Sequence, residues 1–538
     1  MAHRAGRMAA AIRGYRRILA DEPRRFEALY LLGLALAQSG EYSESLRFLE
    51  QARKARPNDP AVFNVRGNAL AGLGRHSEAL ECYDRAVELD PHLAEAFYNR
   101  GIAFAASGRY EKALASYDRA IELNGCYAEA HNNRGNALSA LRRNAEALES
   151  YENALRVRPA FVEAMVNRSI ALRYLHRLEE AIDAAREVLR VNPNCAEGHG
   201  IHGVVLATLG RYSEARAAYN QSLELNPNLP DARWNKALLH LLLGEFLEAW
   251  SHYESRWEVA SLGLQARYPQ VPAWNGAPII PGQKLFLHAE QGYGDTIQFS
   301  RYATLLRNRG ARVVLEVPGS LVRLLQSLDG PEEVISQGSA TPEFDLHCPL
   351  PSLPCAFATQ LETIPSQRSY LRADPRDEAS WRERLGIRRS PRIGLAWAGN
   401  PAHRNDAQRS IPLRDLLPMT ACGLEFIGLH KVLAPEEQSL LAAVPRIRHF
   451  GPALVDFAQT AALIAQMDLV ISVDTAVAHL AGALGTPTWI LLPHVPDWRW
   501  LLGRDSSPWY PTARLWRQAH AGDWPSLVQQ VGRELRTV

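Results

Sequence analysis

The amino-acid sequence repeats itself every 34 residues through its first half, and this period constrains the fold more than any other feature. Alanine marks one phase of the repeat, at Ala79, Ala113, Ala147, Ala181, Ala215 and Ala249. Tyrosine follows four residues later in most units, at Tyr83, Tyr117, Tyr151, Tyr219 and Tyr253, and Ala185 interrupts that column. A fixed period of this length indicates stacked copies of one supersecondary unit, each burying its apolar face against the next.

Each unit has the pattern of two antiparallel helices. In residues 60–93, apolar side chains recur at helical spacing, Gly67 allows a neighbouring helix to approach closely, and Asp90-Pro91 ends the second helix. Seven such units follow a truncated leading helix in residues 1–25. We therefore predict an all-α superhelix over residues 1–263. The pattern resembles the tetratricopeptide repeat, and this resemblance implies stacked helix pairs that form a concave groove.

A second column of the repeat is polar. The sixth position of four units is asparagine, at Asn99, Asn133, Asn167 and Asn235. An asparagine side chain offers a donor and an acceptor, so it can bind a peptide bond without selecting a side chain. Solvent-facing helix positions are also often asparagine without any role, but the shared phase favours binding. A similar ladder lines the superhelix of the protein O-GlcNAc transferases, which implies a protein or peptide client in the groove.

Charge, hydropathy and cysteine content exclude several classes of partner. The net charge is +2 over 538 residues, so there is no basic field that would predict a nucleic-acid partner. No stretch reaches the ~20 apolar residues of a membrane span. The six cysteines are scattered and form no CxxC pair, which is typical of a reducing compartment, and we expect a cytoplasmic protein.

The period changes in the second half of the chain. Residues 264–283 contain four prolines and two glycines and have the composition of a linker. Short apolar runs then alternate with helical patterns, which predicts doubly wound parallel sheets. A break near residues 365–375 indicates two Rossmann-like halves, 284–375 and 376–538, with a cleft between them. The predicted strands are residues 284–289, 312–317, 344–350, 392–397, 424–430, 446–450, 468–472 and 488–493. The predicted fold class is thus α followed by α/β.

The first loop with a candidate chemistry follows the strand 284–289. Gly292 and Gly294 allow a tight turn, and Asp295 stands at the start of the next helix with Glu290 before it. The loop is not a GxGxxG motif, because residue 297 is isoleucine, so a nicotinamide dinucleotide is not predicted. Asp295 could simply cap its helix. Its place at a strand end, where α/β sheets bind ligands, favours a function.

The second loop follows the strand 468–472. Asp474 and Thr475 open a helix of small residues, and the free N–H groups of such a helix bind phosphate well. His479 lies four residues after Thr475 on the same helical face. A lone histidine is often a core residue, but the preceding Asp-Thr pair favours a role in binding.

A third loop, residues 396–413, contains Asn400, Arg404 and Arg409. It is either a solvated basic loop or a site that neutralises a diphosphate, for which arginine has suitable geometry. Lys431, which ends another predicted strand, is a similar candidate.

Taken together, residues 284–302, 392–413 and 468–493 resemble the GT-B glycosyltransferases of the heptosyltransferase-like family 9. The whole chain resembles bacterial proteins that fuse tetratricopeptide repeats to such a domain. The resemblance implies transfer of a sugar from a nucleotide-diphosphate donor to a hydroxyl group. The family commonly has glycine where this chain has Ala476, and lysine in the phosphate loop where this chain has arginines, which leaves the identity of the donor open.

The resemblance also implies roles for the candidate residues. Asp295 would be the general base, with Glu290 as the alternative, and Asp474 would lie near the donor-sugar hydroxyls. Thr475 and His479 would lie near the diphosphate.

From these positions we expect inverting transfer, with Arg409, Lys431 and the helix from Thr475 stabilising the leaving diphosphate. No DxD pair of carboxylates stands near a strand end, so no metal or other cofactor is predicted. Two alternatives remain open: an interaction scaffold with an inactive sugar-nucleotide-binding domain, and a glycan-assembly enzyme that uses the repeats for docking.

Overall fold

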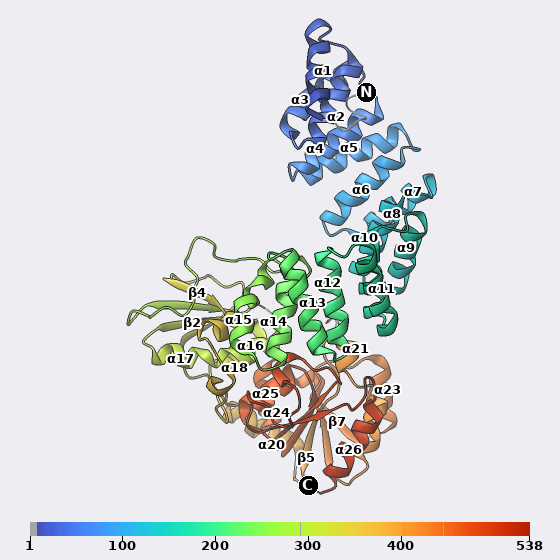
Figure 1. Cartoon of the computed structure of the whole chain (residues 1–538). Helices are drawn as coiled ribbons and strands as arrows, with labels where there is room; N and C mark the ends of the chain where they lie inside the picture. The colour runs from blue at the N-terminus through green and yellow to red at the C-terminus, as the bar shows by residue number, and fades with distance from the viewer. Residues whose placement is uncertain (1–7, 291, 402, 404, 445, 538) are drawn as a thin grey trace. The chain divides into compact units, whose positions relative to one another are not determined.

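The computed structural model of the chain (Figure 1) describes residues 8–290, 292–401, 403, 405–444 and 446–537. Its contacts divide the chain into two compact units, residues 1–227 and 228–538. No described helix is both long and apolar enough to cross a membrane.

The first unit consists of antiparallel helix pairs, which confirms the predicted tetratricopeptide-repeat architecture. A leading helix, α1 (Met8–Asp21), precedes the first pair, α2 (Phe26–Gln38) and α3 (Tyr42–Ala55). The further pairs are α4 (Pro60–Gly72) with α5 (His76–Leu89), α6 (Ala94–Ala106) with α7 (Tyr110–Leu123), α8 (Ala128–Ala140) with α9 (Asn144–Val157), α10 (Val162–Tyr174) with α11 (Leu178–Val191), and α12 (Ala196–Thr208) with α13 (Tyr212–Leu225).

Glycine and tyrosine recur together because four of the helix pairs cross at these two residues. A Cβ atom added to Gly101 would lie 2.5 Å from the ring of Tyr117, and the same conflict recurs in three other units. The glycine therefore makes room for the tyrosine ring of the partner helix. Where Ala185 replaces the tyrosine, the glycine position is filled by Ser169, whose hydroxyl donates to the carbonyl of Ala181 at 2.8 Å.

The second unit begins with the helices of the last predicted repeat, α14 (Pro230–Leu242) and α15 (Phe246–Tyr253). Trp250 of α15 donates its indole N–H to the carbonyl of Thr359 at 2.8 Å, and its ring packs edge-on against Trp498. The compact units thus divide at residue 227, not after residue 263, because the last helix pair packs into the part of the chain that contains the sheets.

Two all-parallel sheets follow, in agreement with the predicted α/β architecture. The first has the order β3 (Pro331–Ser336), β2 (Arg312–Val317), β1 (Lys284–His288), β4 (Leu346–Pro349). The second has the order β10 (Ala513–Arg517), β9 (Thr488–Leu492), β8 (Leu469–Val473), β5 (Arg392–Ala396), β6 (Glu425–Gly428), β7 (Ile447–His449). The eight predicted strands are present, and the two unpredicted strands, β3 and β10, are both edge strands.

The helices of this unit connect the strands. They are α16 (Tyr293–Ser300), α17 (Tyr302–Asn308), α18 (Val322–Leu325), α19 (Leu353–Ala356), α20 (Pro375–Leu385), α21 (Asp406–Arg409), α22 (Leu413–Leu416), α23 (Pro435–Ala443), α24 (Phe457–Ile464), α25 (Ala476–Leu484) and α26 (Trp524–Leu535). Two of them, α16 after β1 and α25 after β8, begin at the carboxyl ends of central strands, where parallel sheets place ligand sites.

Candidate functional site

The loops before α16 and α25 meet each other. Gly292 precedes α16, and Asp295 stands in the first turn of this helix. A Cβ atom added to Gly294 would lie 2.8 Å from Cδ2 of His479 on α25, so the glycine permits close contact between the two helices. The two loops that sequence analysis singled out separately are therefore neighbours.

Asp295 pairs with an arginine that the sequence analysis did not single out. Its Oδ1 accepts a hydrogen bond from Nη2 of Arg499, which lies in the 3₁₀ turn Trp498–Trp500 after β9. Arg499 also donates from Nη1 to Asp497 Oδ1 at 2.9 Å and from Nε to Gln298 Oε1 at 2.7 Å. Burial raises the pKa of Asp295, and the charge of Arg499 opposes that shift.

Asp474, at the end of β8, is influenced by the same charged side chains, Asp497 and Arg499, which we call the charged group together with Asp295. Burial raises the pKa of Asp474 to about 6, and the nearby carboxylate of Asp497 adds to the shift. The charges of Arg409 and Arg499 act in the opposite direction, so both arginines lie within electrostatic reach of Asp474. Thr475 occupies the N-cap of α25, and its hydroxyl lies 3.2 Å from that of Ser472.

His479 is a packed residue that faces this group. Its Nδ1 lies 2.9 Å from the hydroxyl of Tyr510, and its ring stacks on Trp500 with centroids 5.4 Å apart. Its Nε2 is 3.9 Å from Oδ1 of Asp474. Burial lowers the pKa of His479 well below its usual range, so the imidazole is neutral at pH 7 and can serve as a hydrogen-bonding group.

The third predicted loop reaches the group through Arg409. The Nε of Arg409 lies 3.4 Å from Asp406 Oδ1, and the charge of Arg409 opposes the rise in the pKa of Asp474. The carbonyl of Asn400 accepts a hydrogen bond from the backbone N–H of His403 at 2.8 Å. Arg404 lies outside the residues that the structure describes.

Lys431, a further candidate, bonds to the segment before α24. Its exposed side chain donates to the carbonyl of Val455 at 3.0 Å. That hydrogen bond ties the end of β6 to the segment before α24, and it does not link Lys431 to the other candidates.

Glu290 has a structural partner on each of its oxygens. Oε1 and Oε2 accept from Nε and Nη2 of Arg256, both at 2.9 Å, and Arg256 also donates to Ser352. The Arg256 side chain is fully buried and that of Glu290 is 4% exposed. Burial raises the pKa of Glu290, and Arg256 opposes the shift. A carboxylate held in this way ties the segment after β1 to the 3₁₀ turn that contains Arg256.

Arg499 and Asp497 were missed because their role depends on tertiary contacts. The segment PDWRW follows the predicted strand 488–493, so its place at a strand end was the available signal. The ring of Trp498 packs against Phe246, Trp250 and Trp509, with centroids 6.0 to 6.4 Å apart. This aromatic packing fixes the turn that presents Arg499.

The predicted asparagine ladder forms bonds between successive repeats. Nδ2 of Asn99 donates to Asn64 Oδ1 at 3.0 Å, and Nδ2 of Asn167 donates to Asn132 Oδ1 at 3.0 Å. Nδ2 of Asn133 likewise donates to the hydroxyl of Tyr98 at 3.1 Å. In the second unit, Asn235 donates to the carbonyl of Asp231 at 2.7 Å, one turn earlier in the same helix. The side chains of Asn99, Asn133 and Asn167 thus link successive repeats.

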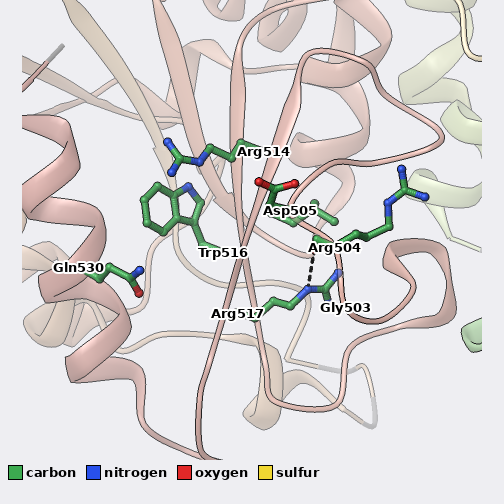
Figure 2. Close-up of a pocket in the computed structure, with 8 residues that line it drawn as sticks. Gly503, Arg504, Asp505, Arg514, Trp516, Arg517 and Gln530 are labelled. Carbon is green, nitrogen blue, oxygen red and sulfur yellow. Dashed lines mark hydrogen bonds between the residues drawn. The ribbon is translucent and has the colours of Figure 1, made fainter.

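A surface pocket of about 470 Å³ lies beside β10 and contains none of the predicted residues (Figure 2). Figure 2 shows the guanidinium groups of Arg504 and Arg514 pointing away from each other, and Arg514 pairs with Glu534 at 2.7 Å. The pocket therefore does not focus positive charge on one point. Among the described residues, no group of three or more His, Cys, Asp or Glu side chains is arranged to hold a metal ion.

Comparisons with known families match both halves of the chain. Tetratricopeptide-repeat families match residues 2–69, 67–108, 94–125, 128–161, 166–230 and 202–258. Glycosyltransferase family 9 (heptosyltransferase) matches residues 453–491, which include Asp474 and His479. With the helix pairs and the parallel sheets, these matches define a tetratricopeptide-repeat protein joined to a glycosyltransferase-like domain.

Among curated proteins, the chain is similar to protein FlbA of Caulobacter vibrioides. The two are 27% identical over an alignment of 312 residues, which covers 53% of this chain and 51% of FlbA. The chain thus spans about half the length of this relative.

Among solved structures, similarity is found to YrrB, described as a tetratricopeptide-repeat protein with an unusual peptide-binding site, at 22% identity over 35% of this chain and 98% of YrrB, with a TM-score of 0.31. The Cut9–Hcn1 hetero-tetramer of the APC/C matches at 18% identity over 47% of this chain and 50% of that chain, with a TM-score of 0.39.

Proposed function

We propose that this protein is a glycosyltransferase that moves a sugar, with inversion, from a nucleotide-diphosphate donor to an acceptor hydroxyl. The observation that carries the proposal is the charged group around Arg499. Asp295 follows β1 of the first sheet and bonds to Arg499, which follows β9 of the second sheet. Asp474, at the end of β8, lies 3.9 Å from His479, whose ring stacks on Trp500 next to Arg499. A base, a donor-binding carboxylate and a cation for phosphate are thereby gathered in one place.

In the proposed step, the Asp295 carboxylate accepts the proton of the acceptor hydroxyl. The acceptor oxygen forms a bond to the anomeric carbon as the bond from that carbon to the diphosphate oxygen breaks. The electron pair of the broken bond leaves on the nucleotide diphosphate, and the proton stays on Asp295. The raised pKa of Asp295 suits this role, because a stronger carboxylate base accepts a proton more readily near neutral pH.

The leaving diphosphate would be stabilised by Arg409, Arg499 and the first N–H groups of α25. These groups supply positive charge, so the proposed step uses no metal ion. Asp474 would hold hydroxyls of the donor sugar, with the neutral His479 beside it.

We further propose that the helix pairs recruit a protein that carries the acceptor or delivers it. The support is the repeat itself, since stacked helix pairs form extended surfaces for proteins. In the second candidate function, the acceptor is a glycan and the repeats bind a partner in glycan assembly. A nucleotide-activated sugar and six free cysteines both suit a reducing compartment such as the cytoplasm.

The activity is tested with Asp295→Asn against a panel of nucleotide sugars, with Asp329→Asn as a control that removes the same charge from an exposed pair with Arg307. We expect Asp295→Asn to lower donor turnover by about 100-fold or more while donor binding remains, because general-base catalysis contributes about that much. The measurement is release of nucleoside diphosphate, with donor binding followed by the thermal midpoint. Undiminished turnover in Asp295→Asn would remove Asp295 as the base. Binding without turnover in the unmodified protein would favour the inactive scaffold.

A further inference from the structure

Arg499 is a buried cation that three side chains hold in one position. Its side chain is 10% exposed, and its Nη2, Nη1 and Nε each donate to a different acceptor, on Asp295, Asp497 and Gln298. Asp295 and Gln298 are one turn apart on α16 and face Arg499 together. The guanidinium is therefore fixed against the acceptor-side helix by a bond to the very carboxylate that we propose as the base.

The backbone that carries Arg499 is also constrained. Trp498 is 5% exposed, and its ring packs against Phe246, Trp250 and Trp509. Movement of the whole turn would break this aromatic packing, so exchange of partners by the guanidinium is the change that this geometry allows most readily.

Two anions would require the same guanidinium. The Asp295 carboxylate is bonded to Nη2. A donor diphosphate held at the start of α25 would lie near the same arginine, because His479 of α25 stacks on Trp500, the residue that follows Arg499. A carboxylate engaged by arginine is a weaker base than a free one, because the cation stabilises its charged form. A diphosphate carries more negative charge than a carboxylate and also accepts bidentate hydrogen bonds from arginine.

We propose that Arg499 is a positioning residue that exchanges Asp295 for the donor diphosphate, so that Asp295 becomes an effective base only after the donor has bound. This inference rests on the proposed function. It predicts an order of binding, with the donor before the acceptor. In the reaction that follows, the proton moves from the acceptor hydroxyl to Asp295, and Arg499 stabilises the charge that builds on the diphosphate.

The test measures the affinity of inorganic pyrophosphate by titration calorimetry, using the full chain. Asp295→Asn should bind pyrophosphate about 10-fold more tightly than the unmodified protein, because Arg499 no longer has to leave a carboxylate. Arg499→Met should bind about 10-fold more weakly or worse, and the double variant should bind like Arg499→Met. Asp329→Asn, which removes the same charge from an exposed pair, should bind like the unmodified protein.

Each other outcome has a definite meaning. If Asp295→Asn and Asp329→Asn bind equally, there is no competition for Arg499 and the inference is overturned. If the double variant binds pyrophosphate as tightly as Asp295→Asn, the increase in affinity does not depend on Arg499, and the inference is again overturned. If the unmodified protein and Asp295→Asn bind neither pyrophosphate nor any nucleoside diphosphate, the proposed function itself fails. Should Arg499→Met not fold, Arg499→Lys replaces it, and a lysine that cannot reach all three acceptors is still expected to weaken binding.

Discussion

At the scale of single residues, the sequence predicted some of the charged residues around Arg499 but not Arg499 itself. The Gly and Asp positions of the two strand-end loops were predicted from the sequence because glycine and helix-capping residues leave local patterns. Arg499 was not predicted, since an arginine in a Trp-rich segment has no local signature of the carboxylates it will meet. Its importance follows only from the packing of η8 (Trp498–Trp500) against α16.

The pKa of Asp474, about 6, predicts how donor binding depends on pH. If the charged carboxylate holds sugar hydroxyls, donor affinity falls as pH drops through about 6, because Asp474 becomes protonated. His479 does not titrate in this range, since burial keeps its pKa well below the usual value. Titration of a bound nucleotide sugar between about pH 5 and pH 7 measures the effect, and Asp474→Asn should remove this fall in affinity. A rise in affinity on acidification that disappears in Asp474→Asn would mean that Asp474 repels the diphosphate, whereas a rise that persists in this variant would come from protonation of Asp295.

At the scale of elements, the helix pairs and eight strands were predictable, whereas the edge strands β3 and β10 were not. The repeat signal accumulates over seven units, so single exceptions such as Ala185 do not obscure it. β3 (Pro331–Ser336) contains two exposed glutamates, and β10 (Ala513–Arg517) contains Arg514 and Arg517. Neither strand therefore has the continuous apolar run of a central strand. The asparagine column was predicted as a column, and the structure adds its bonds between repeats.

The inter-repeat bonds of this column predict a stability effect. Asn99→Ala should lower the thermal midpoint of the helical unit by about 2–4 °C, because it removes one hydrogen bond worth about 1 kcal/mol, and Asn167→Ala should lower it at least as much, because it removes two. Asn220→Ala is the matched control, since Asn220 is exposed on α13 and gains the same helix propensity. Circular dichroism at 222 nm follows the unfolding. Equal midpoints for all three variants would show that the bonds contribute no stability.

At the scale of the whole molecule, the compact units do not coincide with the end of the repeat pattern. Residues 228–263 belong by sequence period to the repeats and by contact to the sheets. They supply Trp250, which bonds to Thr359, and Arg256, which neutralises Glu290. Sequence periodicity could not reveal this, because it records the helix pair and not what the pair packs against.

This arrangement predicts where the chain can be cut. A fragment of residues 228–538 should fold cooperatively, whereas a fragment of residues 264–538 should be insoluble or lack a cooperative transition. Without residues 228–263, Glu290 loses its partner Arg256, and the apolar surface around Trp498 loses the rings of Phe246 and Trp250 that cover it. Soluble yield and thermal unfolding of the two fragments measure the difference. Indistinguishable transitions in both fragments would contradict the assignment.

The packing of the last helix pair, α14 and α15, with the sheets has a consequence for how the number of repeats can change in evolution. Insertion or deletion of whole 34-residue units upstream of residue 228 removes none of the residues that bond to Arg499, Asp295 or Glu290. Recombination between relatives could therefore add or remove repeats before residue 228, provided that α14 and α15 are inherited together with the sheets.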